Sequence, residues 1–167
     1  MDVLYSLRLQ ARYSRWAHAQ LLEHCDALQD EVRKTEWFGT QGSIHGLFNQ
    51  MLLQDRIWLG RMLDKPYVYR SPDQVLYTEY GLLRAERMRT DSEIMNFVQS
   101  LAYPNLDKKI TFTLDHEPRE CTLVLGECLL NLLHRQSAQR GQIMALLEQS
   151  DVDLVPLDML AMPGIAD

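Results

Sequence analysis

The sequence predicts an all-α protein, an antiparallel four-helix bundle with a small β-hairpin inserted before the fourth helix. Four long stretches place apolar residues three and four positions apart, which is the spacing of a helix with one buried face. One short segment between the third and fourth stretches alternates in the manner of a strand. A chain of 167 residues can bury one such core, so residues 1–167 are expected to form a single domain.

The first two predicted helices have clear patterns and boundaries. The first covers about Val3–Leu28, and its apolar positions are Leu4, Leu7, Ala11, Ala17, Leu21, Cys25 and Leu28. The second begins at Ser43, because serine is a favourable N-cap, and it ends before Pro66. Its apolar positions include Ile44, Leu47, Phe48, Met51, Leu52, Trp58, Leu59, Met62 and Leu63.

The third predicted helix runs from about Pro72, since proline suits a first helical turn, to about Leu101. The fourth covers about Val124–Gln149 and carries a dense apolar pattern at both of its ends. The tail that follows it is expected to be a loop with one helical turn from Pro156.

The hairpin is predicted from the segment between the third and fourth helices. Ile110–Leu114 alternates and is rich in β-branched residues, as strands are. Asp115–Pro118 is expected to form the turn, and Glu120–Leu123 a second short strand. An isolated hairpin is marginally stable in water, so this one is expected to lean on the bundle.

Composition narrows the classes of function. Hydrophobic residues make up 46% of the chain and charged residues 24%, which is typical of a globular soluble protein. The net charge of −6 argues against nonspecific nucleic-acid binding, because attraction to phosphates requires a basic face. Cys25, Cys121 and Cys128 lack the spacing of a disulfide framework or zinc knuckle. With no signal peptide and no run of ~18 apolar residues, a cytoplasmic location is expected.

The fourth helix contains a polar run, His134–Gln142, between two apolar ends. Projecting the helical repeat forward from its apolar face predicts that Arg135 and Gln139 point into the core or lie at its edge. The second helix offers Gln50 and Gln54 on its own apolar stripe, and facing polar residues are how bundles build cofactor sites. The alternative is that the run is a solvated surface. Gly141 favours the first interpretation if a packed crossing requires close backbone approach.

Several short motifs together resemble those of one family. "RGQ" at residues 140–142 leads into an apolar turn and a Pro-x-Asp-hydrophobic tail, "PLDML". "YSRWA" at 13–17 and "GSIHGLFNQMLLQDRIWLGRM" at 42–62 complete the set. In this order they resemble the DinB-like bundle proteins, the DinB/YfiT superfamily, over the whole chain. The resemblance implies a DinB-like four-helix bundle that forms a homodimer.

The resemblance also implies a metal site that this sequence does not reproduce. In the family one histidine of the second helix and an H-x-x-x-H pair of the fourth bind a divalent metal. Those three positions hold Gln50, Arg135 and Gln139 here. Slipping the register by one places His134 on a ligand position but Ala138 on its partner position, and His45 matches a histidine that is not a ligand. Because glutamine is a poor ligand and arginine is a cation, no metal is predicted.

Two functions remain open. The first is a small-molecule binding or stress-associated module without metal or other cofactor, which would take a small polar or anionic molecule. Its candidate pocket comprises Gln50, Gln54, His134, Arg135, Gln139 and Gln142. The second is a thiol S-transferase or isomerase acting on low-molecular-weight thiols, with Zn, Ni or Mn held by non-standard ligands. Loss of the ligands favours the first.

Other polar residues are expected to have structural roles. His18 is predicted to be solvated or partly packed. Asp55 and Arg56 are expected to form a local ion pair of little energetic value. Cys128 is predicted to be a small core residue, although Arg135 two turns away would lower its pKa if the two were close.

Overall fold

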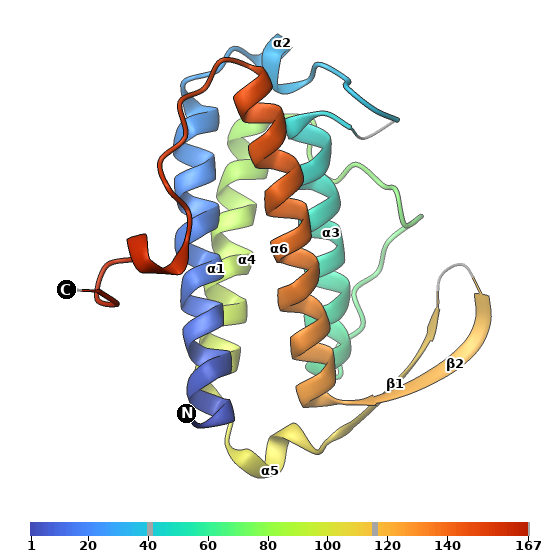
Figure 1. Cartoon of the computed structure of the whole chain (residues 1–167). Helices are drawn as coiled ribbons and strands as arrows, with labels where there is room; N and C mark the ends of the chain where they lie inside the picture. The colour runs from blue at the N-terminus through green and yellow to red at the C-terminus, as the bar shows by residue number, and fades with distance from the viewer. Residues whose placement is uncertain (40–41, 115–116, 167) are drawn as a thin grey trace.

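The computed structural model describes residues 1–39, 42–114 and 117–166. Four long helices pack into a bundle, as predicted (Figure 1). They are α1 (Val3–Asp26), α3 (Ile44–Met62), α4 (Tyr80–Ser100) and α6 (Leu125–Gln149). Short helices α2 (Asp30–Arg33) and α5 (Tyr103–Leu106) lie in the connections, and the 3-10 turn η1 (Met159–Ala161) lies in the C-terminal tail. In the part of the chain so described, no helix has the length and apolar character needed to cross a membrane.

The helices form a closed ring in which each contacts two neighbours. The neighbouring pairs are α1–α4, α4–α3, α3–α6 and α6–α1. The predicted antiparallel order holds for α1–α4 and α3–α6, whereas α3 and α4 run in the same direction, as do α1 and α6 (Figure 1). The reason is the long connection over residues 63–79, which returns along the bundle before α4 begins.

The predicted start of the third helix at Pro72 is wrong, because α4 begins only at Tyr80. Asn49 of α3 explains the difference. Its Oδ1 accepts hydrogen bonds from the backbone N–H groups of Leu76 and Tyr77, each at 2.9 Å, and its Nδ2 donates to the Tyr77 carbonyl. These backbone groups are held by a distant side chain and therefore do not enter a helix.

The other helix boundaries follow local sequence signals. Asp2 accepts a hydrogen bond from the Leu4 N–H and caps α1, and Ser43 caps α3 by accepting from the Gly46 N–H. The approach of the 63–79 connection to α3 is close at Gly60, where an added Cβ would lie 2.7 Å from the carbonyl oxygen of Lys65. Here glycine is required by the packing of backbone against backbone.

The predicted hairpin is present and leans on the bundle. Strands β1 (Lys109–Leu114) and β2 (Glu117–Val124) pair in antiparallel register. Phe112 of β1 packs edge-on against Trp58 of α3, with ring centroids 5.2 Å apart. Asp115 and His116 of the predicted turn lie outside the described residues, and the remainder of that turn belongs to β2.

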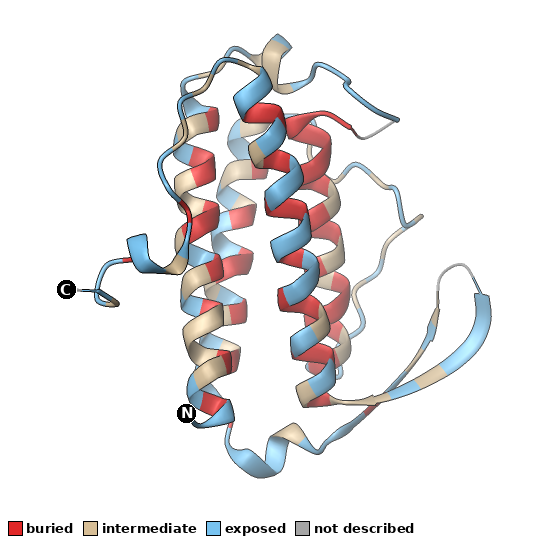
Figure 2. Ribbon diagram, in the orientation of Figure 1, coloured by how far each residue is buried: buried red, intermediate tan, exposed pale blue. Residues whose placement is uncertain are grey.

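The core consists of two hydrophobic clusters, one at each end of the bundle. One gathers the beginnings of α1 and α6 with the ends of α3 and α4, including Leu7, Met62, Val98 and Leu129. The other gathers the opposite helix ends, including Leu21, Phe48, Leu83 and Leu147. Buried residues line the inner face of every long helix along its length (Figure 2). Between the two clusters these inner faces are polar, which explains why α6 turns polar at its centre.

Candidate functional site

A layer of buried polar side chains crosses the middle of the bundle, and all four long helices contribute to it. Its members are Ser14 and His18 from α1, Asp55 from α3, Arg87 and Asp91 from α4, and Gln136 and Arg140 from α6. Each has an exposed fraction of 5% or less. Charged groups at this depth are costly unless they are paired, so their partners decide what the layer can do.

Arg87 is the centre of the layer and is fully buried. Its Nη1 lies 2.7 Å from Asp55 Oδ2 and its Nη2 donates to Asp91 Oδ1 at 2.6 Å. Gln136 donates to the same Asp55 oxygen at 2.8 Å. One guanidinium therefore joins two carboxylates from two helices through charge-assisted contacts, one nitrogen to each carboxylate.

His18 is held in one tautomer by its two neighbours. Its Nδ1 lies 2.9 Å from Asp91 Oδ1 and donates to it, while its Nε2 accepts from Arg140 at 3.3 Å. Burial lowers the pKa of His18, and the raising effect of Asp91 does not compensate. His18 is therefore neutral at pH 7, since its Nε2 lone pair is used by a cationic donor.

The two carboxylates have opposite pKa shifts. Burial raises the pKa of Asp55, and attraction to Arg87 offsets only part of this effect. Burial would also raise the pKa of Asp91, but Arg87 and His18 outweigh it, so the pKa of Asp91 is lowered. Each carboxylate has Arg87 and one neutral donor, but for Asp91 the combined effect of Arg87 and His18 exceeds that of burial. For Asp55 the effect of burial is larger than that of Arg87 and Gln136.

Arg140 differs from Arg87 because all its hydrogen-bond partners are neutral. It donates to Ser14 Oγ at 3.2 Å, to Ser137 Oγ at 2.8 Å and to the imidazole of His18. Its guanidinium carbon lies 5.0 Å from the centre of the Tyr13 ring. Among the described residues no carboxylate forms an ion pair with it, and burial lowers its pKa.

A cavity of about 270 Å³ lies beside Arg140, between α1, α6 and the C-terminal tail. Tyr13, Ser137, Arg140, Gly141, Met144, Leu157 and Asp158 line it. Tyr13 donates from its hydroxyl to the Leu157 carbonyl at 2.6 Å, which holds the tail over the cavity. Asp158 caps the η1 turn by accepting from the Leu160 N–H. The wall therefore carries one cationic side chain, one acidic side chain and apolar surface.

This arrangement suits binding better than acid–base catalysis. A carboxylate that orients a histidine is a common feature of general bases, and Asp91 orients His18 in this way. The free nitrogen of such a base must reach a substrate, whereas His18 Nε2 is fully buried and faces Arg140. The group that reaches a cavity is the guanidinium, which is a donor of hydrogen bonds and cannot take up a proton.

The six candidate-pocket residues predicted from the sequence do not lie together in the core of the bundle. His134, Arg135 and Gln142 are exposed, Gln50 and Gln54 are half-buried, and only Gln139 is buried. Within the described parts of the chain no hydrogen bond joins any two of these six, and none lines the cavity at Arg140. Whether they bind a ligand stays a prediction, but the expectation that Arg135 points into the bundle is wrong.

The phase of α6 explains the error. A step of three residues turns a helix back by about 60° and a step of four turns it forward by about 40°. From the buried Leu132, the inner face continues through Gln136, Arg140 and Ile143, which leaves Arg135 outside. Gly141 was expected at a close crossing, yet an added Cβ there would meet no atom within 4 Å.

The residues that form the layer were missed or assigned other roles. His18 is not solvated, and Asp55 pairs with Arg87 rather than with its neighbour Arg56, which instead pairs with Glu86. A usable signal was present in the sequence: Asp55 and Arg87 occupy positions where the apolar spacing of their helices predicts a buried residue.

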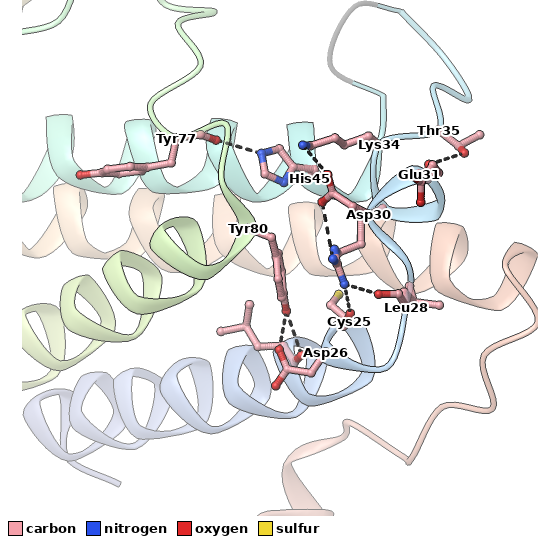
Figure 3. Close-up of polar contacts among 12 residues, drawn as sticks. Cys25, Asp26, Leu28, Asp30, Glu31, Lys34, Thr35, His45, Tyr77 and Tyr80 are labelled. Carbon is pink, nitrogen blue, oxygen red and sulfur yellow. Dashed lines mark hydrogen bonds and ion pairs between the residues drawn. The ribbon is translucent and has the colours of Figure 1, made fainter.

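A second polar cluster closes the end of the bundle near α2 (Figure 3). Arg33 donates to the backbone carbonyls of Cys25 and Leu28 and lies over the Tyr80 ring, 4.1 Å from its centre. Burial raises the pKa of Cys25 to about 12, so its thiol is not a nucleophile at neutral pH. Burial also raises the pKa of Cys128, as expected for a core residue.

His45 serves the same end of the bundle. Its Nε2 donates to the Tyr77 carbonyl at 2.8 Å (Figure 3). Asn49 donates to the same carbonyl. Burial lowers the pKa of His45, which keeps the ring neutral. His45 therefore fixes the 63–79 connection and is not oriented toward the polar layer.

The fold and the layer define a class: four-helix-bundle proteins whose hydrophobic core is divided by a buried polar site. The chain belongs to the DinB family, whose sequence profile matches residues 4–164. A comparison with curated proteins finds no match.

The residues at the family's ligand positions do not fit a metal ion. Arg135 carries a permanent positive charge and is exposed, and Gln50 and Gln139 offer only neutral amide oxygens. The Oε1 atom of Gln139 is buried without a donor. Across residues 1–39, 42–114 and 117–166, no three His, Cys, Asp or Glu side chains are grouped so as to hold a metal.

Proposed function

We propose that this chain is a metal-independent binding module for a small anionic or polar molecule, and that the molecule binds in the cavity at Arg140. One observation carries the proposal: a guanidinium that is 4% exposed has only neutral hydrogen-bond partners and borders a cavity. This guanidinium belongs to Arg140, which lies five positions after Arg135 on the inner face of the same helix.

The energetics favour an acidic group at this place. A buried cation is costly when it lacks a counter-charge, and the planar guanidinium can bind a carboxylate or phosphate through two N–H groups. Asp55 and Asp91 attract Arg140 without a direct ion pair, and a ligand that brings an acidic group supplies that direct partner. Asp158 on the same wall would repel a second negative group and attract an ammonium. Small molecules with both groups, including low-molecular-weight thiols built from amino acids, match this pattern.

Thermal denaturation of untagged protein tests the proposal, with glutamate, cysteine, glutathione and inorganic phosphate as probes. A ligand present at about 100 times its Kd stabilises the folded state by about 2.7 kcal/mol, which is a measurable shift in Tm. Arg140→Gln should abolish the shift, whereas Arg135→Gln should preserve it because that side chain is exposed. No shift with any of the four probes would contradict the proposal.

A second variant, which fills the cavity, keeps the proposal testable if Arg140→Gln does not fold. Gly141 lies in the cavity wall with open space at its Cβ position, so Gly141→Leu should fill the cavity and leave the polar layer unchanged. This variant should fold and lose binding. If it binds as the unchanged chain does, the ligand occupies another site.

Metal dependence separates this proposal from a thiol transferase that uses non-standard ligands. Binding should be unaffected by EDTA, and elemental analysis of the untagged protein should find no stoichiometric Zn, Ni or Mn. Metal at a 1:1 ratio, or binding that requires it, would favour the enzyme. The homodimer expected from the family resemblance stays a prediction, which light scattering coupled to size exclusion can test.

A further inference from the structure

A second cavity, of about 440 Å³, lies between α1, α4 and the C-terminal tail. It is on the opposite side of α1 from the cavity at Arg140. It is lined mainly by Arg12, Arg15 and Trp16 of α1, Met95 and Gln99 of α4, and Met162 of the tail. A smaller cavity of about 120 Å³ shares Arg15 with it and extends along the same two helices. Together they form a groove, which we call the α1–α4 groove.

The charge of the α1–α4 groove is positive at its larger end. Neither Arg12 nor Arg15 has a carboxylate partner among the described residues, and Arg15 contacts only the Met95 sulfur, at 3.5 Å. The chain has 23 Asp and Glu residues, so the two arginines lack a carboxylate partner within the described structure although acidic residues are plentiful. On the neighbouring α4, by contrast, Arg84 and Arg89 are paired with carboxylates.

Of the described residues that line the larger cavity, none is acidic. The one carboxylate of the smaller cavity belongs to Asp91, which is already neutralised by Arg87. Among the residues that the structure describes, an anion in the groove would therefore meet two guanidinium groups and no free carboxylate.

Apart from Gln99, the remainder of the wall is apolar and adaptable. Trp16 is half-buried and stacks obliquely on Tyr13, with ring centroids 6.0 Å apart. Met95 and Met162 face it from α4 and from the tail. Methionine side chains adjust to the shape of a ligand, and an indole offers a large flat contact.

We propose that the α1–α4 groove binds a small amphiphilic anion, with its acidic headgroup on Arg12 and Arg15 and its apolar body along Trp16, Met95 and Met162. The two arginines are three positions apart on one helix, so both can reach one headgroup. The volume is within the range of ~300–1,000 Å³ that is usual for small-molecule sites.

A free amphiphile fits better than a membrane surface. Each basic residue contributes only about 1 kcal/mol at an anionic bilayer, so two arginines on a chain of net charge −6 would attract one weakly. The groove is moreover bounded on its third side by the tail, which suits a molecule of limited size.

Isothermal titration with sodium decanoate, kept below its micellar concentration, tests the proposal. We expect saturable binding at one site, with 1-decanol and decyltrimethylammonium binding at least tenfold more weakly. Arg12→Gln combined with Arg15→Gln should weaken decanoate binding by roughly tenfold or more, since charge-assisted hydrogen bonds are lost. The matched control, Arg119→Gln combined with Arg135→Gln, removes two exposed arginines elsewhere and should have no effect.

A third variant tests the position of the apolar body. Met95→Glu places a carboxylate beside Arg15, so it should pair with the arginine and prevent binding without removing either cation. The proposal is overturned if decanoate does not saturate, if decanol binds equally well, or if the double arginine variant binds decanoate normally. Binding to anionic vesicles without binding of monomeric decanoate would likewise overturn it. These results do not depend on whether the cavity at Arg140 binds a ligand. Binding at that cavity is tested separately, with glutamate as a probe.

Discussion

Replacing Arg87 by methionine removes the cation that joins two buried carboxylates. Methionine has a similar length and fills irregular space well, so the loss of packing is small. The main consequence is electrostatic: Asp55 and Asp91, which are 1% and 4% exposed at their side chains, lose the guanidinium that lies 2.7 and 2.6 Å away. Asp91 keeps His18 as a hydrogen-bond donor and Asp55 keeps Gln136, but both of these partners are neutral.

The expected cost follows from the general behaviour of buried ion pairs. Removing one partner of such a pair destabilises a protein by about 3–5 kcal/mol, because the remaining charge is left in a poor environment. Here one arginine serves two carboxylates, so we expect a value at the upper end of that range at pH 7. Domains of this kind have a free energy of unfolding of about 5–15 kcal/mol, so the variant should be folded but close to its limit.

The loss in free energy of unfolding caused by Arg87→Met should become smaller as the pH falls. In the unchanged protein the lowered pKa of Asp91 contributes stability above the unfolded value of about 3.9, and this is lost as the pH falls through the folded pKa. The raised pKa of Asp55 acts in the opposite sense, costing stability as the pH rises from about 3.9 through the folded pKa. Without Arg87 both pKa values should be raised, so both carboxyls take up protons in the folded state.

Urea denaturation at pH 7 and pH 5, followed by circular dichroism, measures these effects. The triple variant Asp55→Asn, Arg87→Met, Asp91→Asn is the control, because it removes the charges together and should recover most of the lost stability. A cost below about 1 kcal/mol for Arg87→Met at pH 7, or a cost that does not change with pH, would refute the argument that Arg87 neutralises two buried carboxylates.

Three further predictions follow from single contacts. Asn49→Ala should lower the free energy of unfolding by about 2–4 kcal/mol in urea denaturation, because two backbone N–H groups lose their acceptor; an effect under about 0.5 kcal/mol would contradict the assigned role. Gly60→Ala should lower the Tm because its Cβ meets backbone, whereas Gly141→Ala should raise stability by about 1 kcal/mol as a better helix former in open space; equal shifts would show that the approach at Gly60 is not tight. Cys121, which is half-buried, should react with a thiol reagent before the buried Cys25, whose pKa is raised to about 12; faster reaction of Cys25, identified by mass spectrometry, would show that the end of the bundle opens.

The fold was predictable because its signals are local. The spacing of apolar residues identified four helices, Ser43 identified the start of one, and alternation identified the hairpin. The third helix was predicted too long at its beginning, because the Asn49 side chain that holds Leu76 and Tyr77 is 27 and 28 residues away from them in sequence. A propensity read over neighbouring residues contains no information about such a partner.

The sequence by itself determined that this protein is a DinB-like bundle and that its fourth helix is polar at the centre. Only the tertiary structure decided which polar residues face inward, because a helix phase read from apolar residues becomes ambiguous where those residues stop. It also decided the pairing, since His18 and Asp91 are 73 residues apart and Arg140 and Ser14 are 126 apart. A buried polar residue is costly without a partner, and the partners named here, Asp91 for His18 and Ser14 for Arg140, are supplied by another helix.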